Sequence, residues 1–121
     1  MNSGIATSWR REVTCFRCGG VAAALLVDYA SAGRGLTVTL ADFLVRKTSF
    51  LSEPAAESIA EVEDIELARW LPPAFHGFLC HECGAAYCRS CWRVGPPEYD
   101  EGDYAGRHGV CPSGHTGVVD A

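Results

Sequence analysis

The chain has 121 residues, of which 48% are hydrophobic and 21% are charged, and its formal net charge at pH 7 is −5. This composition is that of one ordinary globular domain and excludes a disordered or fibrous chain. It also argues against nucleic acid as a partner, because that affinity comes mostly from Lys and Arg on phosphates and the chain has one lysine beside nine scattered arginines.

The apolar segments indicate which cellular compartment the chain occupies and whether it binds a membrane. Residues 1–13 contain neither the apolar region nor the cleavage signal of a secretory signal peptide. The longest apolar run, residues 21–27, is far shorter than the about 20 residues that span a bilayer, and the acidic charge disfavours acidic membranes. We therefore expect a cytoplasmic protein that binds no membrane and whose cysteines are not oxidised to disulfides.

The first part of the chain predicts a lead-in and a β-hairpin. Residues 1–12 are polar and show no helical or strand period, so we expect a flexible lead-in. Residues 21–29 are apolar, residues 36–40 alternate with a period of two, and the turn sequence 31–35 lies between them. Residues 41–51 have no clear period, and no element is assigned there.

A helix is predicted next. Ser52 is a capping residue, Pro54 suits the first turn, and an Ala- and Glu-rich sequence continues to Trp70, shortly before a pair of prolines. Six acidic residues precede the first base, Arg69, and they are Glu53, Glu57, Glu61, Glu63, Asp64 and Glu66. A charge run of this kind is usually a solvated face. The alternative is a docking surface for a basic protein partner.

The cysteines carry the strongest signal. Three Cys-x2-Cys pairs and one Cys-x3-His half-site use every cysteine of the chain, and their members are Cys15, Cys18, Cys80, Cys83, Cys88, Cys91, Cys111 and His115. A Cys-x2-Cys turn holds two sulfurs against one Zn²⁺, so these half-sites provide eight ligands for two tetrahedral, structural ions. Gly19 and Gly84 follow the second cysteine of a pair, where such turns often need a positive φ.

Several points stay open from the residues alone. His108 forms an alternative half-site with Cys111, although Pro112 and Gly114 favour His115 because they shape a tight turn. The half-sites share the two ions either sequentially or in an interleaved way. Disulfides or buried free thiols are the alternatives to zinc. Residues 95–109, between the last two half-sites, are rich in Pro, Gly and Asp, and we expect no regular element there.

The stretch from Cys80 to Cys91, which reads Cys-x2-Cys-Gly-x2-Tyr-Cys-x2-Cys, resembles the middle of FYVE fingers and is similar to RING and in-between-RING domains. The resemblance implies a cross-brace, treble-clef finger in which the first and third pairs bind one ion and the second and fourth bind the other. Site one would then be Cys15, Cys18, Cys88 and Cys91. Site two would be Cys80, Cys83, Cys111 and His115.

The chain departs from these families in ways that bear on function. Residues 19–79, which are 61 residues, separate the first two pairs and are longer than the segment such fingers usually carry. Residues 75–79 offer no Arg or Lys, so binding of a lipid headgroup is not expected. RING ligases recruit a conjugating enzyme through an apolar residue inside the first pair and an aromatic further on, and Phe16 and Trp92 are the nearest matches. Packing around the zinc sites is the alternative role for both.

Taken together, these features predict a small α+β domain stabilised by zinc, with a β-hairpin and one or two short helices. Residues 13–121 would form a single zinc-binding domain that contains the insertion. Eight protein ligands leave no open coordination position for catalysis. We therefore expect a non-catalytic module that binds or assembles with another protein through the acidic segment from Glu53 to Glu66, and a ligase-like finger is the alternative.

Overall fold

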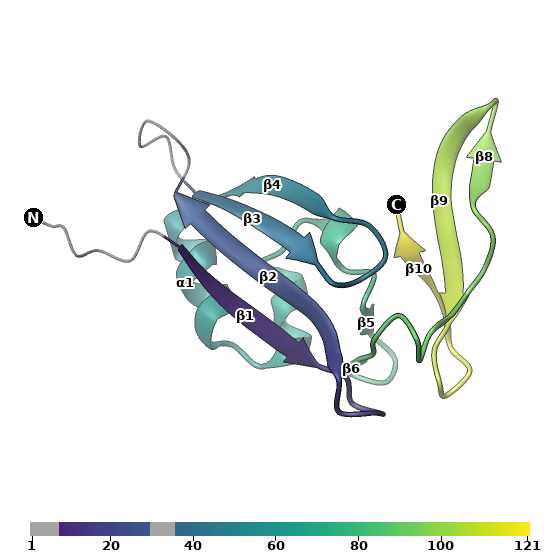
Figure 1. Ribbon diagram of the computed structural model, residues 1–121, viewed down its shortest axis with the longest axis horizontal. Coiled ribbons are helices and arrows are strands. Elements are labelled where there is room, and N and C mark those ends of the chain that lie inside the picture. Colours follow the sequence, from purple (N-terminus) through teal and green to yellow (C-terminus); the bar gives the residue numbers. More distant parts are fainter. Residues whose placement is uncertain (1–7, 30–35) are drawn as a thin grey trace, which may run out of the picture.

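Two antiparallel sheets make up most of the fold (Figure 1). The computed structural model describes residues 8–29 and 36–121. The first sheet has the order β1-β2-β3-β4, with strands β1 (Ser8–Thr14), β2 (Val21–Tyr29), β3 (Leu36–Ala41) and β4 (Lys47–Leu51). The second has the order β10-β9-β7, with β8 also paired to β9, and its strands are β7 (Arg93–Val94), β8 (Glu98–Asp100), β9 (Asp103–Val110) and β10 (Thr116–Asp120). Together with helix α1 (Glu53–Glu61), these strands form the small α+β fold that the sequence predicts.

The predicted hairpin is confirmed. β2 pairs with β3 in antiparallel fashion, with Leu25 opposite Leu40 and Val27 opposite Val38. All four side chains are buried, and such aliphatic pairs pack well on a pleated surface. The predicted turn over residues 31–35 lies outside the described residues. β4 extends this sheet from β3, in the stretch where no element had been assigned.

The prediction of a flexible lead-in needs correction. Its residues 1–7 lie outside the described chain, but residues 8–12 are part of β1, which pairs with β2. Trp9, Arg11 and Val13 lie on the more buried side of this strand, and the residues between them are exposed. Arg11 obscured the period of two, because a cation is not expected on the inward side of a strand.

The helix predicted for residues 52–70 is also shorter than expected. Ser52 does cap it, since its hydroxyl oxygen accepts a hydrogen bond from the backbone N–H of Ala55 at 3.3 Å. The helix ends at Glu61, however, and Val62 is extended. A separate 3₁₀-helix, η2 (Asp64–Arg69), follows.

The side chain of Arg11 contacts the chain where the helix ends. Its guanidinium donates a hydrogen bond at 2.8 Å to the backbone carbonyl of Ile59, one of the last carbonyls of α1, which have no partner within the helix. The same guanidinium pairs with the carboxylate of Asp64 at 2.9 Å. A strand side chain thus stabilises both the end of α1 and the start of η2.

The prediction that residues 95–109 contain no regular element is wrong. β8 and β9 form a hairpin there, with Asp100 opposite Asp103. The two residues between them, Glu101 and Gly102, have φ values of 52° and 87°. Two-residue hairpin turns with positive φ at both positions match the twist of the flanking strands, and they normally carry Asn-Gly or Asp-Gly. Glu in the first position masked the signal.

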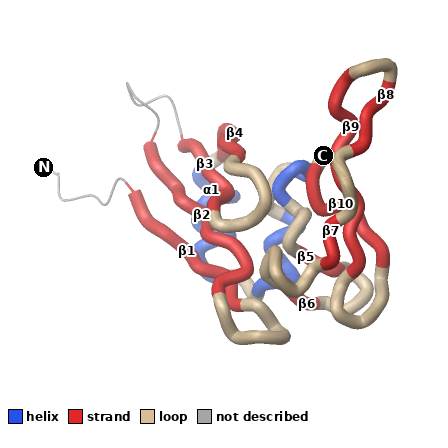
Figure 2. Tube along the Cα trace, turned by 45° about the vertical axis from the view of Figure 1, so that its right-hand side comes forward, coloured by secondary structure: helices blue, strands red, loops and turns tan. Residues whose placement is uncertain are grey.

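A short ribbon lies between the two sheets and helps to connect them. It consists of β5 (Leu79–Cys80) and β6 (Ala85–Ala86), and the 3₁₀-helix η3 (Pro73–Phe75) precedes it. Phe78, just before β5, is fully buried and packs edge-to-face on Phe43 with 6.2 Å between the ring centroids. Figure 2 shows the ribbon beside the lower end of the second sheet. No helix among the described residues is long and apolar enough to cross a membrane.

Candidate metal centres

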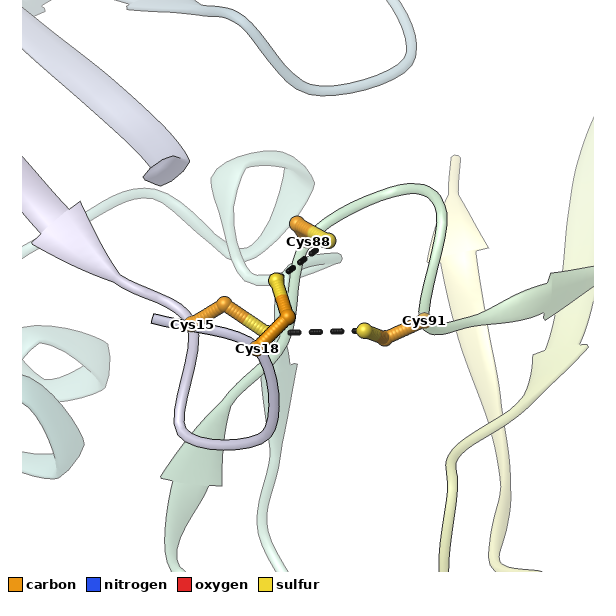
Figure 3. Close-up of side chains that lie close together, drawn as sticks. All are labelled: Cys15, Cys18, Cys88 and Cys91. Atoms are coloured by element: carbon orange, nitrogen blue, oxygen red, sulfur yellow. Dashed lines mark hydrogen bonds between the residues drawn. The ribbon is translucent and has the colours of Figure 1, made fainter. Parts of the chain in front are cut away.

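Four thiols from two distant segments form the first cluster (Figure 3). Cys15 and Cys18 lie in the turn between β1 and β2, and Cys88 and Cys91 lie between β6 and β7. The Sγ atoms of Cys15 and Cys91 are 3.7 Å apart, and so are those of Cys18 and Cys88. All four sulfur atoms lie within 4.8 Å of one another.

The second cluster consists of three thiols and one imidazole. Cys80 ends β5 and Cys83 follows in the turn before β6, whereas Cys111 and His115 lie in the connection between β9 and β10. The Nδ1 atom of His115 is 3.6 Å from the sulfur of Cys80, 3.2 Å from that of Cys83 and 3.5 Å from that of Cys111. The sulfurs of Cys83 and Cys111 are 3.7 Å apart.

These spacings fit a tetrahedral zinc ion. Zn–S bonds of about 2.3 Å and Zn–N bonds of about 2.0 Å give a tetrahedron with S–S edges of about 3.8 Å and S–N edges of about 3.5 Å. The observed separations of 3.7 Å between sulfurs and 3.2 to 3.6 Å between sulfur and nitrogen agree with these edges. A disulfide would bring two sulfurs to about 2.05 Å, and all seven cysteines are free. Each group can therefore hold one metal ion.

Backbone and side-chain donors surround the sulfurs. The backbone N–H groups of Gly20, Cys83 and His115 each donate to a cysteine sulfur at 3.4 Å. Hydrogen bonds of this kind favour the thiolate, the form that binds metal. In the second cluster, hydrogen bonds from the side chains of Tyr87 and Ser113 lower the pKa of Cys83 to about 6, and the bond to Cys83 raises the pKa of Tyr87 to about 12.

Two other thiols, Cys80 and Cys91, carry the opposite shift. Burial and neighbouring thiols raise the pKa of Cys80 to about 11 and that of Cys91 to about 12. Burial also raises the pKa of Cys15, but backbone hydrogen bonds, the first from Cys18, outweigh this and lower it to about 6. Several thiolates packed together repel one another. A divalent ion at the centre would remove that repulsion.

The structure brings together all eight residues singled out from the sequence, in the interleaved arrangement. His115, rather than His108, lies beside the three thiols, because His108 pairs instead with the carboxylate of Glu98 on the β8–β9 hairpin at 2.8 Å. His76, which precedes Cys80 by four positions in the sequence, is not a member of either cluster, and its Nε2 forms a 2.8 Å hydrogen bond with the backbone carbonyl of Leu71. Metal binding by the eight residues remains a prediction.

The aromatic residues near the clusters divide into exposed and buried ones. Phe16, inside the first cysteine pair, is 78% exposed, whereas Trp92, directly after the third pair, is only 4% exposed. Tyr87 packs edge-to-face against both rings. Trp92 is therefore part of the core, whereas Phe16 contacts Tyr87 but leaves most of its ring exposed. The hydrogen bonds of Tyr87 and Ser113 to Cys83 were missed, because no spacing rule links either residue to a particular sulfur.

Comparison with known proteins gives a family but no characterised relative. Residues 6–121 match the model of a protein family described as a domain of unknown function, DUF8328. No curated protein matches the chain. No solved structure matches it either.

Proposed function

The chain belongs to the DUF8328 family, and from this premise we propose that it is a non-catalytic protein-interaction module whose scaffold is held by two structural zinc ions. Zinc is the metal best suited to these donors, because thiolate and imidazole ligands at tetrahedral spacing are typical of structural zinc sites. Each group supplies four protein ligands, which fill a tetrahedron and leave no position for a substrate. A reducing, cytoplasmic location suits such thiolate ligands.

The interleaved grouping supports a cross-brace finger of the kind found in FYVE and RING domains. Cys15 and Cys18 group with Cys88 and Cys91, which are seventy or more positions away in the chain, and the second group interlocks with the first. A sequential arrangement would instead have grouped the first pair with the second. Zinc in the first group would tie the first sheet to the segment that leads into the second, and zinc in the second group would tie the β5–β6 ribbon to the connection between β9 and β10.

The observation that carries the proposed function is an acidic stripe on α1. Glu53, Glu57 and Glu61 are all exposed and are spaced four residues apart, so they follow one face of the helix. None of them forms an ion pair among the described residues. We assign this stripe to the docking of a basic segment of another protein, because exposed charges of one sign steer and orient association.

The rest of the acidic segment has a different role. Asp64 pairs with Arg11 at 2.9 Å and Glu66 pairs with Arg69 at 3.1 Å. The side chain of Arg11 is only 17% exposed, so Asp64 contributes to the fold as well as to the charge. A test of docking should therefore leave Asp64 unchanged.

The experiment is affinity capture from the source cells with zinc-loaded protein, read by mass spectrometry. We expect the triple variant Glu53→Lys, Glu57→Lys and Glu61→Lys to lose its main partner and to bind what remains with less dependence on salt, at unchanged zinc content. A matched control reverses the same charge at the tip of the β8–β9 hairpin, with Asp100→Lys, Glu101→Lys and Asp103→Lys, all exposed positions. Capture that is equal for the triple variant and the wild type would remove the docking stripe.

One observation favours a second candidate, a ubiquitin-ligase-like finger. Phe16 is exposed in the turn that holds the first cysteine pair, the position through which RING ligases contact a conjugating enzyme. Trp92, the other match to that contact, is buried and cannot take part without rearrangement. A discharge assay with a thioester-loaded conjugating enzyme separates the two functions, since Phe16→Ala should abolish transfer by a ligase and leave capture by the acidic stripe intact.

A further inference from the structure

We propose that a groove at the opposite end of the molecule from α1 binds an acidic peptide segment of a partner protein. The groove lies between the β3–β4 loop, residues 42–46, and the β8–β9 hairpin, and it encloses about 510 Å³. We call it the arginine groove and define it by Leu44, Val45, Arg89, Tyr99, Tyr104 and Arg107. The inference rests on the proposed function as an interaction module, but it concerns a second surface with the opposite charge.

The walls of the arginine groove are apolar and aromatic. Val45 on one side is 49% exposed, and Tyr99 on the other is 64% exposed. Tyr99 and Tyr104 stand edge-to-face with their ring centroids 6.0 Å apart. Two exposed tyrosines on a projecting hairpin offer a large, rigid contact area that costs little side-chain entropy to fix on binding. The walls therefore suit apolar or aromatic side chains of a ligand.

The floor of the groove is polar but already satisfied. Lys47 pairs with Asp120 at 2.6 Å and also donates to the backbone carbonyl of Ala74 and to a carboxyl oxygen of Ala121, each at 3.1 Å. The hydroxyl of Tyr104 donates to the same carboxylate of Asp120. Lysine and aspartate neutralise each other here, so neither is left to recognise a charged ligand.

Arg89 and Arg107 supply the charge that remains. Both line the groove, and neither forms an ion pair with any carboxylate in the described part of the chain. Arg89 is exposed and Arg107 is half-buried. Arg107 also has a side-chain hydrogen bond with Tyr104, but neither guanidinium has a carboxylate partner among the described residues, in a chain with a formal net charge of −5. Guanidinium groups bind carboxylates through two parallel hydrogen bonds, which gives geometric specificity as well as affinity.

This combination identifies the ligand class. A peptide with two acidic residues next to an aromatic or aliphatic one matches both guanidiniums and the walls. Nucleic acid fits less well, because a long polyanion would meet the negative charge of the rest of the molecule. Figure 1 shows α1 and the β8–β9 hairpin on opposite sides of the molecule, so the two docking surfaces can act independently.

The test selects ligands from a random dodecapeptide phage library on zinc-loaded wild-type protein. We expect the enriched peptides to carry Asp or Glu beside an aromatic or aliphatic residue. A fluorescent copy of the best peptide should bind at least tenfold more weakly to Arg89→Gln, Arg107→Gln and the double variant. Replacing its acidic residues by Asn and Gln should have the same effect. Arg93→Gln is the matched control, because Arg93 is an exposed arginine that does not line the groove.

Several results would overturn the proposal. One is enrichment of peptides with no acidic residues, or no enrichment at all. Another is an acidic peptide that binds both single variants as tightly as it binds the wild type. Arg107→Gln could perturb the fold, but Arg89 is exposed, so Arg89→Gln keeps this comparison valid. Binding of a single-stranded oligonucleotide that both variants abolish would assign the groove to nucleic acid instead. The acidic stripe on α1 is unchanged in every variant, so failure here leaves the proposed function standing.

Discussion

At the scale of single residues, the cysteine sulfurs have hydrogen-bond donors around them in addition to the spacing of metal ligands. Backbone N–H groups donate to Cys18, Cys80 and Cys111, and Tyr87 and Ser113 favour the thiolate of Cys83. Such outer contacts orient metal ligands and tune their basicity. These donors favour the thiolate form, which is the form that binds metal.

The choice of His115 as the eighth ligand leads to the first prediction. His115→Ala should lower the zinc content from two ions per chain to one and lower the melting temperature sharply, because it removes a donor that lies 3.2 to 3.6 Å from three sulfurs. Elemental analysis and a thermal melt measure both effects. His108→Ala is the control, since it removes only an exposed ion pair with Glu98 that contributes little. The reverse result would move the second site to His108.

The second prediction concerns Asp120, which is buried at the base of the arginine groove. Burial raises its pKa, but the ion pair with Lys47 and the hydrogen bond from Tyr104 outweigh this and hold the pKa below its ordinary value. A carboxyl group with a lowered pKa stabilises the fold above its unfolded pKa and loses that contribution as the pH falls through the folded one. The stabilisation is therefore complete at neutral pH.

Asp120→Asn should destabilise the zinc-loaded protein by about 3 kcal/mol, because it leaves Lys47 partly buried without a counter-charge. Urea unfolding should give the same difference at pH 6 and pH 8, since Asp120 is ionised at both. Asp103→Asn, at an exposed position of β9, should change little. A difference that grows or vanishes between these two pH values would contradict the assignment.

At the scale of elements, local chemistry at the ends of helices and strands decides most of the boundaries. The β2–β3 hairpin was predictable because an apolar run, a turn sequence and a segment that alternates with a period of two follow one another in the chain. β1 was missed because Arg11 lies on its more buried side and obscures the period of two. The end of α1 was missed because Arg11 contacts a carbonyl and a carboxylate there from about fifty positions away. The β8–β9 hairpin was missed because Glu101 occupies a left-handed turn position, φ 52°, that usually holds Asn or Asp.

That turn gives the third prediction. Gly102 has φ 87°, and a Cβ added there would meet nothing within 4 Å, so Gly102→Ala tests backbone strain without a steric clash. We expect a loss of about 1 kcal/mol of unfolding free energy, because alanine enters this region at a cost. Glu101→Asn should instead stabilise the hairpin slightly, since Asn tolerates the left-handed region better than Glu. Urea unfolding measures the change in unfolding free energy for each variant, and changes of the same sign and size would contradict the turn assignment.

At the scale of the whole molecule, the two clusters connect parts of the chain that the sequence alone does not place side by side. The eight cluster residues could be singled out because paired cysteines with x2 spacing are so specific a pattern. Their grouping could not be derived from spacing, since sequential and interleaved sharing need the same residues. The arginine groove was invisible for a similar reason, because Arg89, Arg107 and the β3–β4 loop meet only through the fold.

The last prediction follows from this dependence on long-range links. Purified protein should contain two Zn²⁺ per chain. A strong chelator should unfold it, because structural zinc contributes on the order of 10 kcal/mol to folding and a chain of 121 residues has a small core. Far-ultraviolet circular dichroism should show loss of the sheet signal, and added zinc should restore it. Cys18→Ser, in the first cluster, and His115→Ala, in the second, should each leave one ion bound. Zinc-free protein that keeps its fold through disulfides would show that the cysteines serve as covalent links, and the interleaved zinc scaffold would then have to be abandoned.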